Sequence, residues 1–136
     1  MVVTCRPTWE GGQFDGSEEA RRRILGAALE AGAEYVDVEW RAGFADLIAS
    51  APTRVVVSSH DFSGVPVDLA SQAVEMRRTG AGTIKVAVTA RRLTDTLVLR
   101  GIAVGGPAVV IAMGDAGVTT RILAGRFGSV WSYAGR

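Results

Sequence analysis

Short apolar runs rich in β-branched residues alternate with helix-like segments along the whole chain. Runs of this kind predict strands, and strands that are apolar on both faces are typical of a parallel sheet covered by helices. The predicted strands are residues 2–5, 35–39, 55–59, 83–88, 108–112 and 129–132. We therefore expect a single α/β domain over residues 1–136, built from about six βα units.

The segments between the strands have the apolar spacing of amphipathic helices. Ser17 followed by Glu18 and Glu19 is typical of a helix N-cap with an acidic first turn, and this helix should end near Gly32. Further helices are expected around residues 44–48, 66–80, 93–104 and 118–124. The side chains expected to face the sheet are Ile24, Leu25, Ala28 and Leu29 in the first helix, Phe44, Leu47 and Ile48 in the second, and Leu69, Ala73 and Met76 in the third.

This order of elements fits either an open doubly wound sheet or a (β/α) barrel. No Gly-x-Gly-x-x-Gly loop follows the first strand, because Gly11-Gly12 is followed by no third glycine at that spacing, and no Gly-Lys-Ser/Thr loop is present. The doubly wound nucleotide-binding folds thus lack their fingerprint. We expect an α/β fold of the TIM (β/α)₈ barrel family, here as an incomplete barrel.

Composition singles out one residue. Of 15 basic residues only Lys85 is a lysine, and it lies in a predicted strand, whereas all the others are arginines. A guanidinium stays protonated and cannot become a nucleophile, so a lone buried lysine indicates amine chemistry. The alternative is a strand-end lysine that reaches out to water. Period-two alternation places Thr83 and Ala87 beside Lys85 on the inner face, where both are small.

The only histidine, His60, ends the strand before Lys85 in the sequence. A buried amine has a lowered pKa and can attack a carbonyl carbon to form an imine. A neutral imidazole nearby is suited to remove the adjacent proton and to return it to a leaving group. Together Lys85 and His60 predict proton abstraction next to a carbonyl, followed by elimination, isomerisation or carbon–carbon cleavage.

Arg121 is expected at the start of a helix, where a guanidinium and a helix N-terminus together favour a carboxylate ligand. A surface ion pair with Asp115 or Glu39 is an equal alternative for Arg121. Glu10 could orient His60 or bind substrate hydroxyls, or it could be a plain loop carboxylate.

Asp37 and Glu39 share one face of their strand, as the ligands of a metal ion often do. No second histidine or cysteine completes a ligand set, so no metal is expected.

Charge and hydropathy narrow the class of protein. The formal net charge is +1, and the densest basic run, Arg21-Arg22-Arg23, follows two glutamates and is interpreted as the solvated face of a helix, so no nucleic-acid partner is expected.

Cys5 is the only cysteine, which excludes an internal disulfide and fits a reducing compartment as a buried structural thiol. Neither a secretory signal nor a membrane-spanning stretch is recognised, and a cytoplasmic protein is expected.

Several motifs together resemble one family, type I 3-dehydroquinate dehydratase. They are Thr4-Cys5-Arg6-Pro7-Thr8-Trp9-Glu10-Gly11-Gly12, Tyr35-Val36-Asp37-Val38-Glu39, Ser58-Ser59-His60-Asp61-Phe62, Ile84-Lys85-Val86-Ala87, Met113-Gly114-Asp115-Ala116-Gly117 with Arg121, and Phe127-Gly128-Ser129. The resemblance implies the conversion of 3-dehydroquinate to 3-dehydroshikimate in the shikimate pathway, with no cofactor and no metal. It implies that Lys85 forms the imine, that His60 is the general acid and base, and that Glu10 orients His60. Arg6 and Arg121 are implied to bind the substrate.

The resemblance aligns the start of this chain with the third strand of a barrel that has eight. A Glu-x-Arg motif on the family's second strand, and a Ser loop and an Ala-Pro-Gly-Gln segment near its end, have no counterpart here. We therefore expect open strand edges that can pair with another chain, for example in a homodimer, and little or no dehydratase activity from these 136 residues.

Two other interpretations remain. A Schiff-base aldolase or transaldolase uses the same lysine chemistry on a similar barrel, although the sequence around His60 and Glu10 matches the dehydratase instead. Alternatively, the chain is a catalytically inactive fragment that self-associates without forming an imine.

Overall fold

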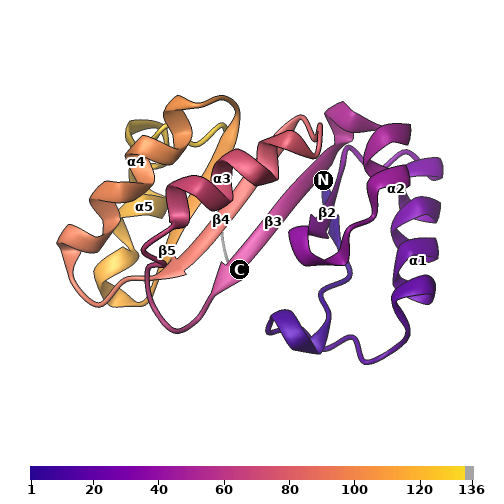
Figure 1. Ribbon diagram of the computed structural model, residues 1–136, viewed down its shortest axis with the longest axis horizontal. Coiled ribbons are helices and arrows are strands. Elements are labelled where there is room, and N and C mark those ends of the chain that lie inside the picture. The colour runs from indigo at the N-terminus through magenta and orange to yellow at the C-terminus, as the bar shows by residue number, and fades with distance from the viewer. Residues whose placement is uncertain (134–136) are drawn as a thin grey trace.

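The computed structural model describes residues 1–133, and its centre is a five-stranded parallel sheet (Figure 1). The strands are β1 (Val2–Thr4), β2 (Tyr35–Glu39), β3 (Val55–Asp61), β4 (Thr83–Thr89) and β5 (Ala108–Met113). They lie in the sheet in their chain order, and every neighbouring pair is parallel. Five of the six predicted strands are thus confirmed.

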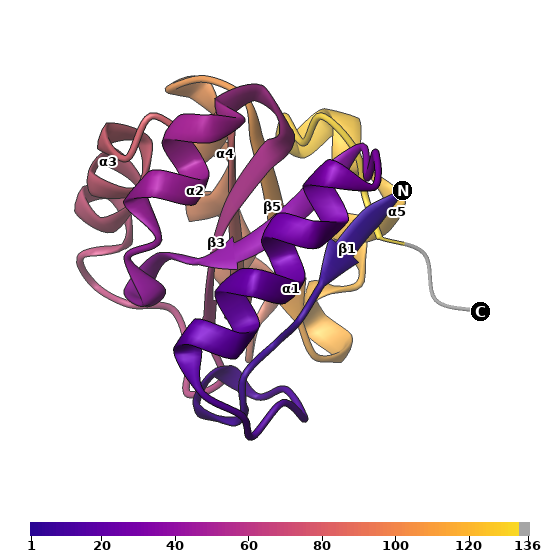
Figure 2. The ribbon, with the colours of Figure 1, turned by 90° about the vertical axis from the view of Figure 1, so that its right-hand side faces the viewer.

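A helix follows each strand. The helices are α1 (Glu18–Glu30), α2 (Ala45–Ser50), α3 (Leu69–Arg78), α4 (Leu97–Val104) and α5 (Thr119–Ile122). Ser17 caps α1 as predicted, because its hydroxyl accepts a hydrogen bond from the backbone N–H of Ala20. Figure 2 shows α1 lying across the sheet beside β1. Within residues 1–133, none of the helices is both long and apolar enough to span a membrane.

The consecutive strand order separates the two folds that fit the sequence. A doubly wound sheet reverses its strand order at a switch point and carries helices on both faces. A barrel adds each strand next to the previous one, and right-handed crossovers then place every helix on the same, outer face. The observed order has no reversal, so the sheet is of the barrel type.

The two faces of β4 have different surroundings. Three of its side chains belong to the main apolar core under the helices: Ile84, Val86 and Val88. On the opposite face Ala87 packs with Val109 and Ile111 in a smaller cluster. Alternation places Lys85 on this second face, so the predicted inward orientation of the lysine is confirmed.

The prediction of a sixth strand over residues 129–132 is wrong. A single bridge joins Ser129 to β5, with the backbone N–H of Val130 donating to the carbonyl oxygen of Ala108 at 2.9 Å. The N–H of Val110 donates to the side-chain hydroxyl of Ser129 at 3.0 Å, in place of a backbone carbonyl. Beyond it the chain leaves the sheet edge, and the ring of Trp131 packs on Tyr35 with 4.7 Å between centroids. The contact between these two rings buries aromatic surface on the inner face, and this packing replaces further backbone hydrogen bonds to β5.

Helix α1 is rotated relative to the expected orientation. Ile24, predicted to face the sheet, is 44% exposed, whereas Leu25 and Leu29 are buried as predicted. Arg21 was expected on the solvated face and is fully buried. The buried stripe therefore follows the four-residue spacing of Arg21, Leu25 and Leu29, which a hydrophobicity pattern misses because its first member is charged.

This rotation predicts that two adjacent aliphatic side chains contribute very differently to the free energy of unfolding. Leu25→Ala should lower the free energy of unfolding by about 2–5 kcal/mol, because it opens a cavity under α1. Ile24→Ala should change it by only about 0.5 kcal/mol, because that side chain is half exposed. Urea unfolding followed by circular dichroism measures both, and equal losses would contradict the rotation.

Candidate active site

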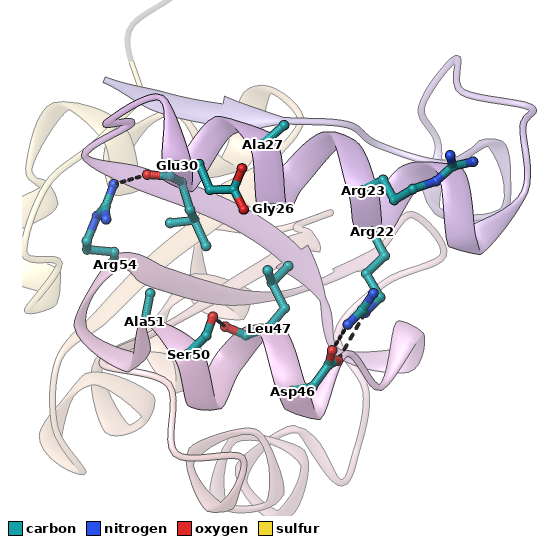
Figure 3. Close-up of a pocket in the computed structure, with 11 residues that line it drawn as sticks. Arg22, Arg23, Gly26, Ala27, Glu30, Asp46, Leu47, Ser50, Ala51 and Arg54 are labelled. Carbon is teal, nitrogen blue, oxygen red and sulfur yellow. Dashed lines mark hydrogen bonds and ion pairs between the residues drawn. The ribbon is translucent and has the colours of Figure 1, made fainter.

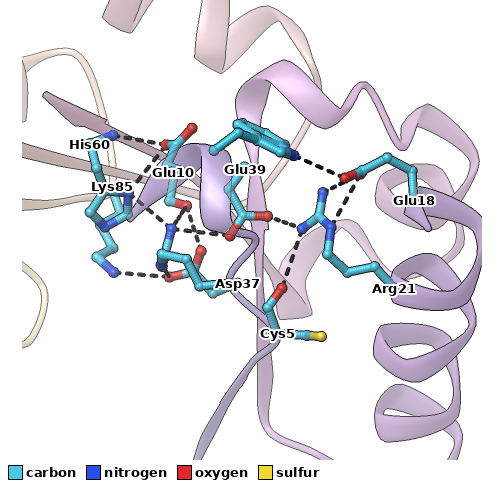
Figure 4. Close-up of polar contacts among 11 residues, drawn as sticks. Cys5, Glu10, Glu18, Arg21, Asp37, Glu39, His60 and Lys85 are labelled. Carbon is cyan, nitrogen blue, oxygen red and sulfur yellow. Dashed lines mark hydrogen bonds and ion pairs between the residues drawn. The ribbon is translucent and has the colours of Figure 1, made fainter. Parts of the chain in front are cut away.

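Side chains from four strands converge on the inner face of the sheet near its carboxyl edge (Figure 4). Parallel strands all end at this edge, which is where barrel proteins carry their functional groups. The register sets Glu39 of β2 level with Ser58 of β3, and Ser58 level with Lys85 of β4. Arg6, just beyond β1, and His60, near the end of β3, complete the group.

Lys85 is 6% exposed, and its Nζ donates a hydrogen bond to Oδ2 of Asp37 at 2.9 Å. Burial lowers the pKa of Lys85 because desolvation disfavours the ammonium, and the Asp37 carboxylate opposes this shift. The ring of Tyr133 lies 4.4 Å from Nζ. Burial also raises the pKa of the Tyr133 phenol to about 12. The lysine is thus screened from water and held by a single carboxylate oxygen.

Asp37 is the central acceptor of the site. It is fully buried, Oδ2 accepts from both Lys85 and Arg6 at 2.9 Å, and Oδ1 accepts from the hydroxyl of Ser58 at 2.5 Å. Burial alone would raise the pKa of Asp37, but the two cations and the hydroxyl outweigh it and hold the pKa below its usual value. A buried carboxylate is tolerated here because every oxygen is bonded and two positive charges face it.

His60 has its Nδ1 atom between a donor and an acceptor. Nη1 of Arg6 lies 2.9 Å away and can only donate, whereas Oε1 of Glu10 lies 3.2 Å away and can only accept while ionised. Burial lowers the pKa of His60, and the contact with Glu10 opposes the shift. A neutral imidazole is therefore favoured, and its tautomer depends on which neighbour Nδ1 engages.

A short 3₁₀ turn, Thr8–Glu10, carries Glu10 back over the strand ends. The side chain is 6% exposed, and Oε1 accepts a hydrogen bond from the backbone N–H of His60 at 2.9 Å. Glycine is required after this turn: a Cβ on Gly12 would lie 2.1 Å from the carbonyl oxygen of Arg6. The Glu-Gly-Gly sequence thus lets the loop fold tightly enough for the carboxylate to reach β3.

The structure does not bring Arg121 to this group. It lies on α5, is exposed, and forms no ion pair within residues 1–133, either with Asp115 or with Glu39. Glu39 is paired with Arg6 and Arg21 instead. Arg121 follows the end of β5, so it stands on the same edge of the sheet as the site.

Three residues in or next to the site were not predicted from the sequence: Asp37, Ser58 and Arg21. Asp37 was considered as a metal ligand and stood in one motif of the resemblance, but it was given no role beside Lys85, although its position on the inner face of β2, two strands from the lone lysine, was a usable signal. Ser58 gave no signal beyond its position in a strand. Arg21 was assigned to the solvent because it belongs to a basic run. No group of three or more metal-binding side chains is present within residues 1–133.

A separate groove lies on the outer side of the protein, between α1 and α2 (Figure 3). Three of its charged side chains already have structural partners: Arg22 pairs with Asp46, and Arg54 donates to the carbonyl oxygens of Leu29 and Ala33. The groove contains no lysine, histidine or cysteine. It therefore lacks the buried amine and the imidazole that the inner face combines, and the inner face is the candidate active site.

The site can do a definite kind of chemistry. A buried amine with a lowered pKa can form an imine with a ketone or aldehyde, and a neutral imidazole on the neighbouring strand can move a proton. The parallel sheet with consecutive strand order and this amine site together define a (β/α)-barrel protein with a lysine-based site.

Comparison with known proteins identifies the family. A family model described as type I 3-dehydroquinase matches residues 1–135. The 3-dehydroquinate dehydratase of Desulfotalea psychrophila is 34% identical, over 98% of this chain and 65% of its own length. The bifunctional chloroplastic 3-dehydroquinate dehydratase/shikimate dehydrogenase of Arabidopsis thaliana is 35% identical over 97% of this chain and 23% of its own length. This chain belongs to the type I 3-dehydroquinase family.

Solved structures agree on the fold. The 3-dehydroquinate dehydratase of Geobacillus kaustophilus superposes with a TM-score of 0.84 at 33% identity, over 98% of this chain and 58% of that one. The type I enzyme of Clostridium difficile superposes with a TM-score of 0.86 at 24% identity. The predicted barrel-family fold is thereby confirmed, and the chain spans 58–65% of the length of these relatives, the bifunctional protein apart.

The His60 environment makes a prediction for NMR, in which the only histidine gives one unambiguous titration curve. Its pKa should lie below 6.5, and Glu10→Gln should lower it further by removing the carboxylate that favours the imidazolium. The exposed Glu19→Gln should leave it unchanged. Since the folded chain binds this proton more weakly than the unfolded chain, stability should also fall as the pH drops below about 6.5. A raised pKa would contradict the geometry.

Proposed function

We propose that this chain carries the catalytic centre for dehydrating 3-dehydroquinate to 3-dehydroshikimate through an imine on Lys85. The observation that carries this proposal is the buried Nζ of Lys85, which donates a hydrogen bond to Asp37. Lys85 lies on β4, directly beside the strand that carries His60. The family membership supports the choice of substrate. The chain spans only part of its relatives' length, so their activity comes to this chain as a proposal.

The proposed reaction uses the two groups in sequence. The neutral amine of Lys85 attacks the C3 ketone, and loss of water gives a protonated imine that withdraws electrons from C2. His60 removes a proton from C2, and the electron pair expels the C1 hydroxyl, which leaves as water with a proton from His60. Hydrolysis of the imine then releases the product and restores the amine.

The remaining site residues are assigned supporting roles. Glu10 orients His60, which its contacts with the backbone and ring nitrogens of that residue support. Arg6 binds substrate from its position between Asp37 and His60. Arg121 binds the substrate carboxylate, which requires its exposed guanidinium to turn toward the inner face.

Association with a second copy is part of the proposal. Within residues 1–133, β1 pairs with β2 on one side only, so its other edge offers backbone donors and acceptors to another strand. Analytical ultracentrifugation distinguishes a homodimer from a monomer. Cytoplasmic location, as expected from the sequence, is consistent with this role.

Borohydride trapping tests the imine directly. After incubation with 3-dehydroquinate and reduction, peptide mass spectrometry should find the adduct on Lys85, the only lysine in the chain. Lys85→Arg keeps the positive charge beside Asp37 and should abolish the adduct, because a guanidinium does not lose its proton. An adduct formed only with aldehyde sugars would favour an aldolase, and no adduct at all would favour a catalytically inactive chain.

His60 should act after the imine forms. We expect His60→Gln to retain a trapped adduct of the undehydrated substrate, whereas the unmodified chain should give an adduct lighter by one further water. Because little multiple turnover is expected from these 136 residues, enone formation is followed by ultraviolet absorbance in a single turnover with the chain in excess. It should slow by about 10²–10⁴-fold, the usual contribution of a general acid and base. Loss of the adduct itself in His60→Gln would show that the histidine acts earlier than proposed.

A further inference from the structure

The segment that follows β5 covers the inner face of the sheet and brings an aromatic ring to the lysine. After the bridge at Ser129, the side chains of Trp131 and Tyr133 pack against the smaller apolar cluster of β4 and β5. The contact between Trp131 and Tyr35 anchors the segment over β2. Tyr133 is thereby held over β4, where the centroid of its ring lies 4.4 Å from Nζ of Lys85.

The contacts of Nζ leave the ring free to act on the charge of the amine. An ammonium carries three N–H bonds. Within residues 1–133, the only oxygen that accepts a hydrogen bond from Nζ of Lys85 is Oδ2 of Asp37. The second contact of this nitrogen is with the ring of Tyr133. The face of an aromatic ring is electron-rich and attracts a cation within about 6 Å of its centroid, so the observed distance allows this attraction.

Shielding from water strengthens the attraction. Lys85 is 6% exposed, and the phenol oxygen of Tyr133 is buried. The attraction between a cation and an aromatic face is larger when both are removed from water. Burial raises the pKa of Tyr133 to about 12, so the phenol keeps its proton at neutral pH. The ring therefore acts through its neutral face and not as a phenolate.

The charged groups around Lys85 are largely engaged with one another. The carboxylates of Asp37 and Glu39 favour the ammonium, whereas Arg6 and burial disfavour it. Both carboxylates are also paired with Arg6. The imidazole of His60 faces the lysine as well, and burial favours its neutral form. A neutral ring, in contrast, stabilises the cation without being shared with an arginine.

We propose that Tyr133 is a further catalytic residue, whose ring stabilises the positive charge at Nζ of Lys85 in the ammonium and again in the protonated imine. The charge stays on the same nitrogen in both states, and the ring lies where each state needs it. A protonated imine withdraws electrons from the adjacent carbon, from which His60 takes a proton. The effect on the amine follows from contacts within this chain, whereas its consequence for dehydration rests on the proposed function.

NMR titration of the sole lysine tests the effect on the amine without any substrate. Selective ¹³C labelling of lysine gives one ε-carbon signal, and this signal reports the pKa of Lys85. Tyr133→Phe keeps the ring and should leave the pKa unchanged. Progressive fluorination of that phenylalanine withdraws electrons from the ring face at nearly constant size, and should lower the pKa stepwise by about one in total, a tenfold change in proton affinity. An unchanged pKa across the fluorinated series would overturn the proposal.

Two smaller side chains separate attraction to the ring from simple shielding. Tyr133→Leu keeps an apolar cover without an electron-rich face, so the pKa of Lys85 should fall. Tyr133→Ala admits water to the amine, so the pKa should be higher than in the leucine variant. Val130→Ala, at an exposed position of the same segment, is the matched control and should leave the pKa unchanged. A leucine variant with the pKa of the unmodified chain would show that the ring is merely a cover.

Borohydride trapping with 3-dehydroquinate tests the effect on the imine. Tyr133→Phe should match the unmodified chain. Its fluorinated forms should still give the Lys85 adduct, but formation of the dehydrated adduct should slow by about two- to thirtyfold. Equal rates with and without fluorine would refute the role in catalysis. Absence of any adduct in the unmodified chain would refute the proposed function, and the pKa series would still decide whether the ring stabilises the charge.

Discussion

The buried carboxylate of Asp37 is the interaction on which the site depends. It accepts from Lys85, Arg6 and Ser58, which come from three other strands or strand ends, and it is fully shielded from water. Removing one partner of such a buried pair leaves an uncompensated charge and typically costs about 3–5 kcal/mol. The carboxylate therefore fixes the positions of the lysine and the arginine together, and through the arginine it reaches the histidine.

The same interaction sets the reactivity of the amine. Burial lowers the pKa of Lys85 and makes free amine accessible, while Asp37 opposes the shift and keeps the side chain in one place. An isolated buried lysine would be more easily deprotonated but would have no fixed orientation, and an exposed one would stay charged. The balance suits a nucleophile that must be neutral when it attacks and positively charged in the imine that follows.

Several parts of the fold and site were predictable because they depend on local pattern. The alternation around Lys85 identified its inward face, the apolar runs located five strands, and Ser17 identified the start of α1. The predictions failed where the same residues can either join a strand or make other contacts. Residues 129–132 are strand-like in composition, yet the hydroxyl of Ser129 and the ring of Trp131 make better contacts outside a ladder.

By itself, the sequence determined the order and type of the elements, the inner-face position of the lone lysine, and the nearby histidine. These follow from periodicity and residue chemistry, which act over a few neighbouring positions. Only the tertiary structure decided the partners: Asp37 for Lys85, and Glu39 for the buried Arg21. Ion pairs between distant strands depend on sheet register and on helix rotation, and both are set by packing of the whole domain rather than by the residues next to each charge.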